Sequence, residues 1–256
     1  PVDPKDLRVA LFSGNYNYVR DGANQALNRL VAYLLRHGAQ VRVYAPTTDT
    51  PAFEPTGDLV SLPSVPIPIR SEYRLGLGLS PRVRRDLAAF GPNVVHISAP
   101  DIVGHRAVTW ARPRGIAAVA SVHTRFETYL QYYRLHWFEP VIRAMLRRFY
   151  RRCDAIVACL ALHHVPPGVR RRRLLRRLYH RCEAIMAPAQ STAAVLRAQR
   201  MNREISIWAR GIDRDQFNPG RRDLEWRRGL GIAADELAIA YLGRIVMEKG
   251  LDVFAE

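Results

Sequence analysis

The amino-terminal segment carries a strand, a glycine-containing loop, a helix and a second strand in direct succession. Residues 8–13 form a short apolar run that stops at Gly14, and residues 23–37 place apolar side chains at helical spacing. Gly38 ends that helix, and residues 40–45 form a second apolar run. A strand–helix–strand unit requires two parallel strands in one sheet, so this segment predicts an α/β fold.

The alternation of strands and helices continues along the chain. We predict further helices over residues 82–90, 102–110, 137–152 and 191–200, and further strands over residues 93–98, 116–123, 155–158 and 205–208. The proline-rich residues 51–81 are predicted to be irregular, with a short strand near Leu59 and Val60. About six strands separated by helices predict a Rossmann-type, doubly wound parallel sheet, which binds ligands at the carboxyl ends of its strands.

A change of composition near residue 210 predicts a domain boundary. Turn-forming residues dominate residues 210–220, and a short helix over residues 224–230 and a strand over residues 237–242 follow. The predicted parts are a Rossmann-like domain over residues 1–209, a connector over residues 210–220 and the incomplete start of a second Rossmann domain over residues 221–256.

The positive charge is concentrated in one segment. The net charge is +16, and twelve arginines against one acid lie between Arg143 and Arg181. Residues 147–158 recur at residues 176–187 with eight of twelve positions identical, so we interpret residues 159–187 as a basic, duplicated, exposed insertion. Such arginine density indicates an anionic partner.

Three interpretations of the basic segment stay open. The helix over residues 137–152 can lie on an anionic membrane surface, or it can be a core helix of the Rossmann fold with a solvated basic face. Arginine runs also supply nonspecific affinity for nucleic acid, but no recognised module indicates specific binding. The 48% hydrophobic and 24% charged residues exclude a disordered or membrane-embedded chain. Three cysteines without CxxC spacing favour a reduced, cytoplasmic compartment.

Four motifs, in this order along the chain, resemble those of the family 4 glycosyltransferases. They are Phe12-Ser-Gly14 with Asp21-Gly-Ala-Asn24, Ser121-Val-His-Thr-Arg-Phe126, Gly211-Ile-Asp213 with Phe217-Asn-Pro219, and Gly243-Arg244 with Glu248-Lys249-Gly250. Members of this family are retaining enzymes with two Rossmann domains, the GT-B arrangement. The amino-terminal half is most similar to the branch of sulfoquinovosyl- and mannosyltransferases that act on lipids.

The resemblance implies a division of labour between the predicted domains. Residues 1–209 would bind the acceptor, and residues 221–256 would begin the domain that binds the nucleotide sugar. That second domain carries a paired-glutamate motif in the family, which would lie beyond Glu256.

The resemblance also implies catalytic residues. Arg244 and Lys249 flank a strand-to-helix turn and would clamp the donor diphosphate, on which negative charge develops as the sugar leaves. Gly243 would let the backbone approach that diphosphate, and His123 would contact the reacting sugar. An ordinary turn with two solvated cations and a core histidine are the structural alternatives.

A second set of residues is predicted to bind substrate. Gly14, Asn15, Gly22 and Asn24 form a glycine-containing loop before a helix amino terminus, which is a candidate cradle for an anion or acceptor. A plain strand-to-helix turn is the alternative. Arg125 would line the acceptor side, whereas His96, in the middle of a strand, is predicted to be a core residue.

We therefore expect a retaining transferase that moves a sugar from a UDP- or GDP-sugar to a lipid or glycan hydroxyl. No cofactor and no metal are expected, because arginine and lysine would neutralise the diphosphate, and no specific nucleic acid is expected as a partner. The protein would be cytoplasmic, and peripheral at the inner face of the membrane if its basic segment binds anionic lipid. The alternatives are a catalytically inactive partial glycosyltransferase that binds such a surface, and an epimerase or phosphorylase with the same two-domain fold.

Overall fold

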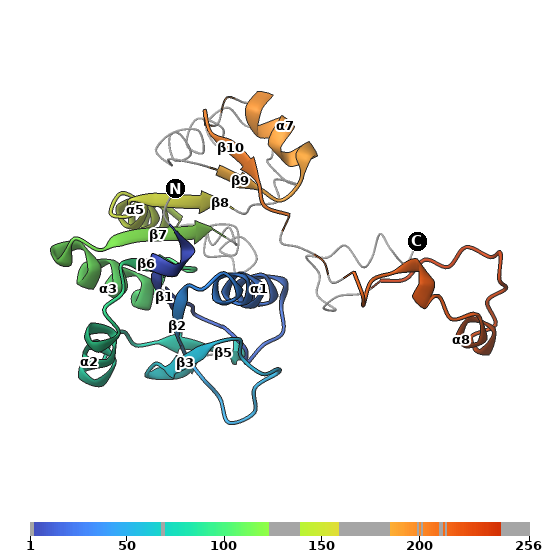
Figure 1. The fold of residues 1–256 in the computed structure, drawn as a ribbon, viewed down its shortest axis with the longest axis horizontal. Helices are drawn as coiled ribbons and strands as arrows, with labels where there is room; N and C mark the ends of the chain where they lie inside the picture. The colour runs from blue at the N-terminus through green and yellow to red at the C-terminus, as the bar shows by residue number, and fades with distance from the viewer. Residues whose placement is uncertain are drawn as a thin grey trace. The chain divides into compact units, whose positions relative to one another are not determined.

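The computed structural model describes residues 3–67, 70–122, 139–158, 185–198, 200, 202–209, 212 and 214–241. The chain divides into two compact units, Pro1–Gly211 and Ile212–Glu256. The first unit holds a parallel sheet with helices on both of its faces, and the second holds one short helix among its described residues (Figure 1).

The secondary structure follows the predicted alternation. The strands are β1 (Arg8–Phe12), β2 (Gln40–Ala45), β3 (Asp58–Ser61), β4 (Ser64–Ile67), β5 (Arg70–Gly76), β6 (Val94–Ile97), β7 (Ala117–Val122), β8 (Ala155–Ala158), β9 (Ile185–Ala187) and β10 (Ile205–Ile207). The helices are α1 (Gly22–Arg36), α2 (Pro81–Phe90), α3 (Ile102–Ala111), α5 (Glu139–Tyr150), α7 (Gln190–Ala198) and α8 (Leu224–Gly229). Single 3₁₀ turns span Pro4–Asp6, Arg112–Arg114 and Pro219–Arg221.

Six strands form one parallel sheet in the order β3-β2-β1-β6-β7-β8. β1 lies between its two partners, with Val9 paired to Val41 of β2 and to Val94 of β6. The strand order reverses direction at this point, so α1 after β1 and α3 after β6 lie on opposite faces of the sheet, and doubly wound sheets bind ligands at such a reversal. The predicted α/β class and doubly wound parallel sheet are confirmed.

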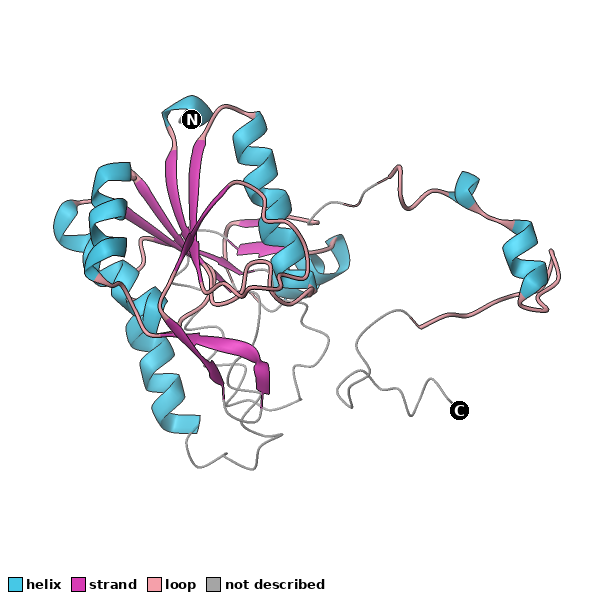
Figure 2. Ribbon diagram, turned by 90° about the horizontal axis from the view of Figure 1, so that it is seen from below, coloured by secondary structure: helices cyan, strands magenta, loops and turns pink. Residues whose placement is uncertain are grey.

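The alternation of side chains along β1 divides the core into two layers. Leu11 packs with Leu27 and Val31 of α1, whereas Phe12 belongs to the cluster that α2, α3 and α5 cover on the other face. Figures 1 and 2 show α1 on one side of the sheet and these three helices on the other. α1 ends before Gly38, whose φ of 87° lies in the left-handed region that glycine tolerates.

The proline-rich segment contains more regular structure than predicted. The short strand near Leu59 is confirmed as β3, but β4 and β5 form an antiparallel hairpin where an irregular stretch was expected. Val65 pairs with Leu75, and Pro66 is accommodated because a two-stranded sheet leaves one side of each strand free of ladder hydrogen bonds. The prediction of an irregular stretch was wrong because a strand of a two-stranded sheet needs ladder hydrogen bonds along only one edge, which proline permits.

The internal repeat is described in part. The last residues of the first copy form β8, at the edge of the main sheet, and the last residues of the second copy form β9. β9 pairs with β10 in a separate parallel sheet, with Ile185 opposite Ile205. The rest of the predicted insertion lies outside the described residues.

α5 packs as a core helix of the Rossmann domain. Its residues Phe149 and Tyr150 are 1% and 6% exposed and join the core cluster that also contains residues of α3. Its outer face carries the exposed arginines Arg147 and Arg148 together with the exposed Met145. Of the interpretations left open by the sequence, a core helix of the Rossmann fold with a solvated basic face is the one that agrees with the packing of α5.

The strand predicted over residues 237–242 is not found in the part of this segment that the structure describes. Residues 237–241 have no strand structure, and Leu237 and Ile239 are 83% and 74% exposed. Among the described residues, no neighbouring strand pairs with this segment, so its backbone groups have no ladder to join. The short helix predicted just before it is confirmed as α8.

The helices of the described residues are all too short or too polar to cross a bilayer.

We predict that Gly104→Ala destabilises the first unit. A Cβ at this position in α3 would lie 2.3 Å from the carbonyl oxygen of Ala99 and 2.7 Å from Cγ2 of Ile97, so the helix must move off the sheet. We expect a loss of about 1–3 kcal/mol in the free energy of unfolding, measured by urea denaturation. Gly22→Ala is the matched control, because its Cβ meets nothing within 4 Å. Equal stability of the two variants would contradict this packing.

Candidate functional site at the carboxyl edge of the sheet

The loops that follow β1 and β6 meet at the crevice where the strand order reverses. The ladder continues beyond β6, because the Ser98 amide donates to the Phe12 carbonyl at 2.9 Å. Beyond it, a Cβ on Gly14 would lie 3.0 Å from Oδ2 of Asp101. A residue with no side chain at position 14 therefore lets the two loops approach each other closely.

The loop after β1 is fixed by its own hydrogen bonds. The Ser13 hydroxyl donates to the Asn15 carbonyl at 2.5 Å, and the Tyr18 hydroxyl donates to the Gly14 carbonyl at 2.7 Å. Asn15 donates through Nδ2 to the Val19 carbonyl and accepts from the Val19 amide. The side chain of Asn15 thus closes the loop on itself, and its predicted contact with substrate stays a prediction.

α1 begins immediately after this loop. Asp21 caps the helix by accepting a hydrogen bond from the Asn24 amide at 2.9 Å, and Gly22 is the first helical residue. Among the described residues, apart from its chain neighbours and the backbone of α1, no atom lies within 4 Å of a Cβ built on Gly22. The free amides and the helix dipole give this helix end a partial positive charge, which suits the predicted anion cradle.

Asn24 points into the protein. It is 3% exposed, and its Nδ2 donates to the Val19 carbonyl at 2.9 Å. One turn later, the buried Asn28 donates to the backbone carbonyls of Tyr16 and Asn24. These amides join the loop to α1, so the role that the structure gives Asn24 is to hold the cradle in shape.

Two ionisable groups at the crevice were missed by the sequence reasoning. Burial raises the pKa of Asp101 to about 6, although its Oδ1 caps α3 by accepting from the Gly104 amide at 2.8 Å. Burial also raises the pKa of Tyr18, whose hydroxyl accepts from the Arg74 amide at 3.1 Å. The available signal for Asp101 was its position as a helix-capping residue directly after a buried strand.

His96 is a core residue, as predicted. Its side chain is buried in the sheet, and its Nε2 lies 2.9 Å from the Ser121 hydroxyl on the neighbouring strand β7. Burial lowers its pKa to about 4, so the ring is neutral at physiological pH. Ser121 begins the motif that continues into His123, and β7 ends one residue before that histidine.

Five of the predicted site residues lie outside the described residues. These are His123, Arg125, Gly243, Arg244 and Lys249. The other four, Gly14, Asn15, Gly22 and Asn24, lie together in the loop after β1 and the first turn of α1, at the carboxyl edge of the sheet. Within the described part of the chain, no three His, Cys, Asp or Glu residues are grouped in a way that could hold a metal ion.

Comparison with known families decides the classification. The model of Glycosyltransferase Family 4 matches residues 20–161, which is more than half of the chain. The chain belongs to glycosyltransferase family 4. The matched region begins just before α1 and runs through β8, so it contains every strand of the main sheet except β1, together with α1 and the loop after β6.

Named relatives of this family 4 chain transfer different sugars. Sulfoquinovosyl transferase SQD2 of Arabidopsis thaliana is 26% identical and covers 98% of this chain and 45% of its own length. GDP-mannose-dependent alpha-mannosyltransferases of Corynebacterium glutamicum and Mycolicibacterium smegmatis are 23% and 26% identical, covering 98% and 97% of this chain and 54% and 59% of their own. The chain thus spans about half the length of these relatives.

A solved structure is also similar over much of the chain. An alpha-glucosyltransferase in complex with UDP and a 13-mer DNA aligns with 86% of this chain and 46% of its own, at 8% identity and a TM-score of 0.36.

We predict that Asp101→Asn removes a pH-dependent loss of stability. The carboxyl group has a pKa of about 6 in the folded chain, above its ordinary value near 3.9, so the folded state holds a proton that the unfolded state releases. Stability should fall as the pH rises from about 4 to 6, by about 2 kcal/mol from this group. Asparagine still caps a helix but cannot ionise.

The measurement is urea denaturation of wild type and variant between pH 4 and 7. Asp21→Asn makes the same substitution at the cap of α1 and controls for capping. Parallel pH profiles for wild type and Asp101→Asn would contradict a buried carboxyl group at the crevice.

Proposed function

We propose that this chain is the acceptor-side domain, with the start of the donor domain, of a retaining glycosyltransferase. The enzyme would move a sugar from a UDP- or GDP-sugar to a lipid or glycan hydroxyl. The observation that carries the proposal is the family 4 match over residues 20–161, which covers α1 and the loop after β6, because ligands of doubly wound sheets bind where the strand order reverses. The relatives named as GDP-mannose-dependent alpha-mannosyltransferases support a nucleotide-sugar donor.

In the proposed reaction the bond between the sugar's anomeric carbon and the leaving phosphate oxygen breaks. The acceptor oxygen forms the new bond on the same face, and its proton passes to the leaving phosphate. Negative charge therefore develops on the diphosphate, and preorganised cations lower the barrier most where that charge appears. We assign this task to Arg244 and Lys249, assisted by the backbone at Gly243, and we assign a contact with the donor sugar to His123.

On the acceptor side, the proposal uses the crevice between the loops after β1 and β6. The open amino terminus of α1 at Gly22 can hold an anionic or hydroxyl-rich group, and Gly14 keeps the neighbouring loop close. Above its pKa of about 6, the Asp101 carboxylate can accept a hydrogen bond from an acceptor hydroxyl. Arg125 is assigned to the same side. The described surface is basic around α2, α3 and α5, which favours an acceptor presented at an anionic membrane.

The first test measures transfer and its dependence on His123. The purified protein is incubated with radiolabelled UDP- and GDP-sugars and diacylglycerol or glycolipid acceptors, and the glycoside is detected by chromatography. We expect product with an anomeric configuration equal to that of the donor, and we expect His123→Ala to lower the rate about 100-fold. His37→Ala, at the exposed end of α1, is the control. Release of sugar phosphate or an epimerised nucleotide sugar without glycoside would favour the phosphorylase or epimerase alternative.

A second prediction concerns Gly22. Gly22→Ala adds a Cβ in open space at a helix start, so stability should be unchanged or raised by up to about 1 kcal/mol. If the helix end receives the substrate, the same methyl group should raise KM at least several-fold without unfolding the protein. Unchanged KM and kcat would show that the substrate does not approach this end of α1. Gly229→Ala, in the second unit, also adds a methyl group where nothing lies within 4 Å and serves as the control.

A further inference from the structure

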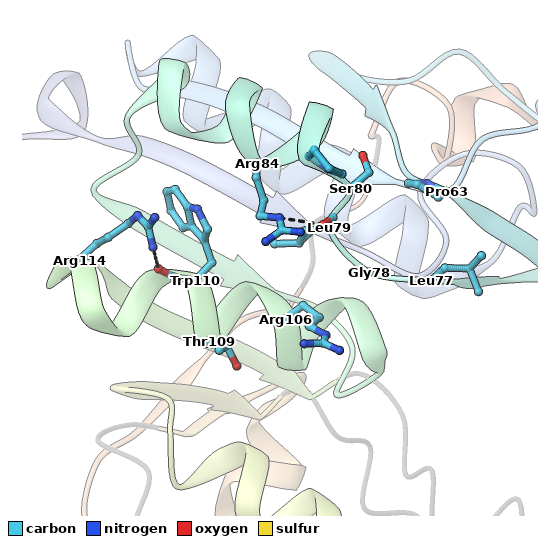
Figure 3. Close-up of a pocket in the computed structure, with 11 residues that line it drawn as sticks. Pro63, Leu77, Gly78, Leu79, Ser80, Arg84, Arg106, Thr109, Trp110 and Arg114 are labelled. Carbon is cyan, nitrogen blue, oxygen red and sulfur yellow. Dashed lines mark hydrogen bonds between the residues drawn. The ribbon is translucent and has the colours of Figure 1, made fainter.

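An open hollow lies between α2 and α3, on the face of the sheet opposite to α1 (Figure 3). Its volume is about 620 Å³, and it is lined by Pro63, Leu77, Gly78, Leu79, Ser80, Pro81, Arg84, Arg106, Thr109, Trp110 and Arg114. None of these residues is acidic. The lining combines an apolar floor with three guanidinium groups, which is the composition of a site for an organic anion.

The three arginines come from separate turns of the chain. Arg84 extends from α2 toward α3, Arg106 lies on α3, and Arg114 lies in the 3₁₀ turn after it. Arg84 donates through Nε to the Leu79 carbonyl at 3.1 Å. Arg114 donates to the Trp110 carbonyl at 2.8 Å, and its guanidinium carbon lies 4.5 Å from the Trp110 ring centroid. Each bond occupies one of five N–H groups and fixes the side chain, so donors remain for a ligand.

The positive charge of the hollow is not neutralised within the described residues. Asp86, the acid on α2, accepts hydrogen bonds from Arg42 and Tyr44, and no described carboxylate forms an ion pair with Arg84, Arg106 or Arg114. A further cation reaches the rim, because Arg152 donates to the hydroxyl of Thr109 at 2.7 Å. Several positive charges around one hollow that has no acidic lining residue favour binding of a group with at least one negative charge.

We propose that this hollow binds the phosphate group of an organic phosphate ester. The planar guanidinium group matches phosphate oxygens with two parallel hydrogen bonds, so we assign the phosphate to the arginines that line the hollow. The apolar floor at Leu79 and Trp110 suits a carbon chain or glycerol unit attached to it. The ester can belong to a phospholipid headgroup or to a soluble phosphate compound. This proposal does not rest on the proposed sugar transfer. Phosphate binding by the hollow is measured without a sugar donor or acceptor.

The hollow and the crevice are connected through helix α3. α3 begins at the Asp101 cap and carries Arg106 five residues later, a rise of about 7 Å along the helix. The segment that leads into the hollow crosses the first turn of α3, since a Cβ on Gly76 would overlap Cγ2 of Val103 at 2.4 Å. A phosphate held by Arg106 therefore lies on the same rigid helix that carries a wall of the crevice.

The experiment compares two double variants that remove the same charge. Arg84→Gln/Arg106→Gln changes the hollow, and Arg29→Gln/Arg36→Gln changes α1 on the other face of the sheet. Binding of the whole chain at 0.15 M salt is measured by sedimentation with vesicles of phosphatidylglycerol and phosphatidylcholine, with phosphatidylcholine vesicles alone, and by titration with soluble glycerol phosphate. We expect the hollow variant to bind at least ten-fold more weakly than wild type and the α1 variant to bind within two-fold of it.

The two arms identify the source of the phosphate. Binding to the anionic vesicles without competition by glycerol phosphate indicates a phospholipid headgroup, whereas titration by glycerol phosphate indicates a soluble ester. Arg84→Lys/Arg106→Lys keeps the charge but loses the paired donors, so it should bind between wild type and the glutamine variant. No binding to either probe, or an equal loss in the two glutamine variants, overturns the proposal.

Discussion

The parallel pairing of β1 with β2 on one side and β6 on the other is the constraint on which the molecule depends. Because parallel strands need a crossover, and crossovers are right-handed, α1 is placed on one face of the sheet and α2 and α3 on the other. The helices that follow β1 and β6 lie on opposite faces, while the loops that precede these helices lie side by side at the carboxyl edge of the sheet. The crevice between them follows from the connectivity of the sheet and does not require a specific side chain.

Side chains decide how narrow and how polar this crevice is. Gly14 permits the Asp101 carboxylate to approach the first loop, and the loop is held by hydrogen bonds from Asn15 and Tyr18 to its own carbonyls. The resulting burial explains why the pKa of Asp101 is raised and why a carboxyl group can persist there, since three backbone amides partly offset the loss of water. The proposed acceptor site uses this loop, and the hydrogen bonds within the loop would hold the site in one shape.

The same connectivity creates the basic hollow. Arg84 and Arg106 lie on different helices, and only the packing of α2 and α3 on one face of the sheet makes both residues part of the lining of one hollow. The sequence concentrates its arginines between residues 143 and 181, so composition directs attention to that segment and away from the hollow. Charge density along a chain and charge density on a surface are separate properties, because a helix distributes neighbouring residues over all its sides.

The amino-acid sequence alone determined the α/β class, the strands of the main parallel sheet, the helices that cover it, and His96 as a core residue. Those features depend on local periodicity and on apolar runs, which the sequence displays directly. The β4–β5 hairpin and the absence of a strand at Leu237 depend on which neighbours are present, and pairing partners are distant in sequence. The proximity of Gly14 to Asp101 and the inward orientation of Asn24 were decided by the tertiary structure, because burial and contact arise only when separate elements pack together.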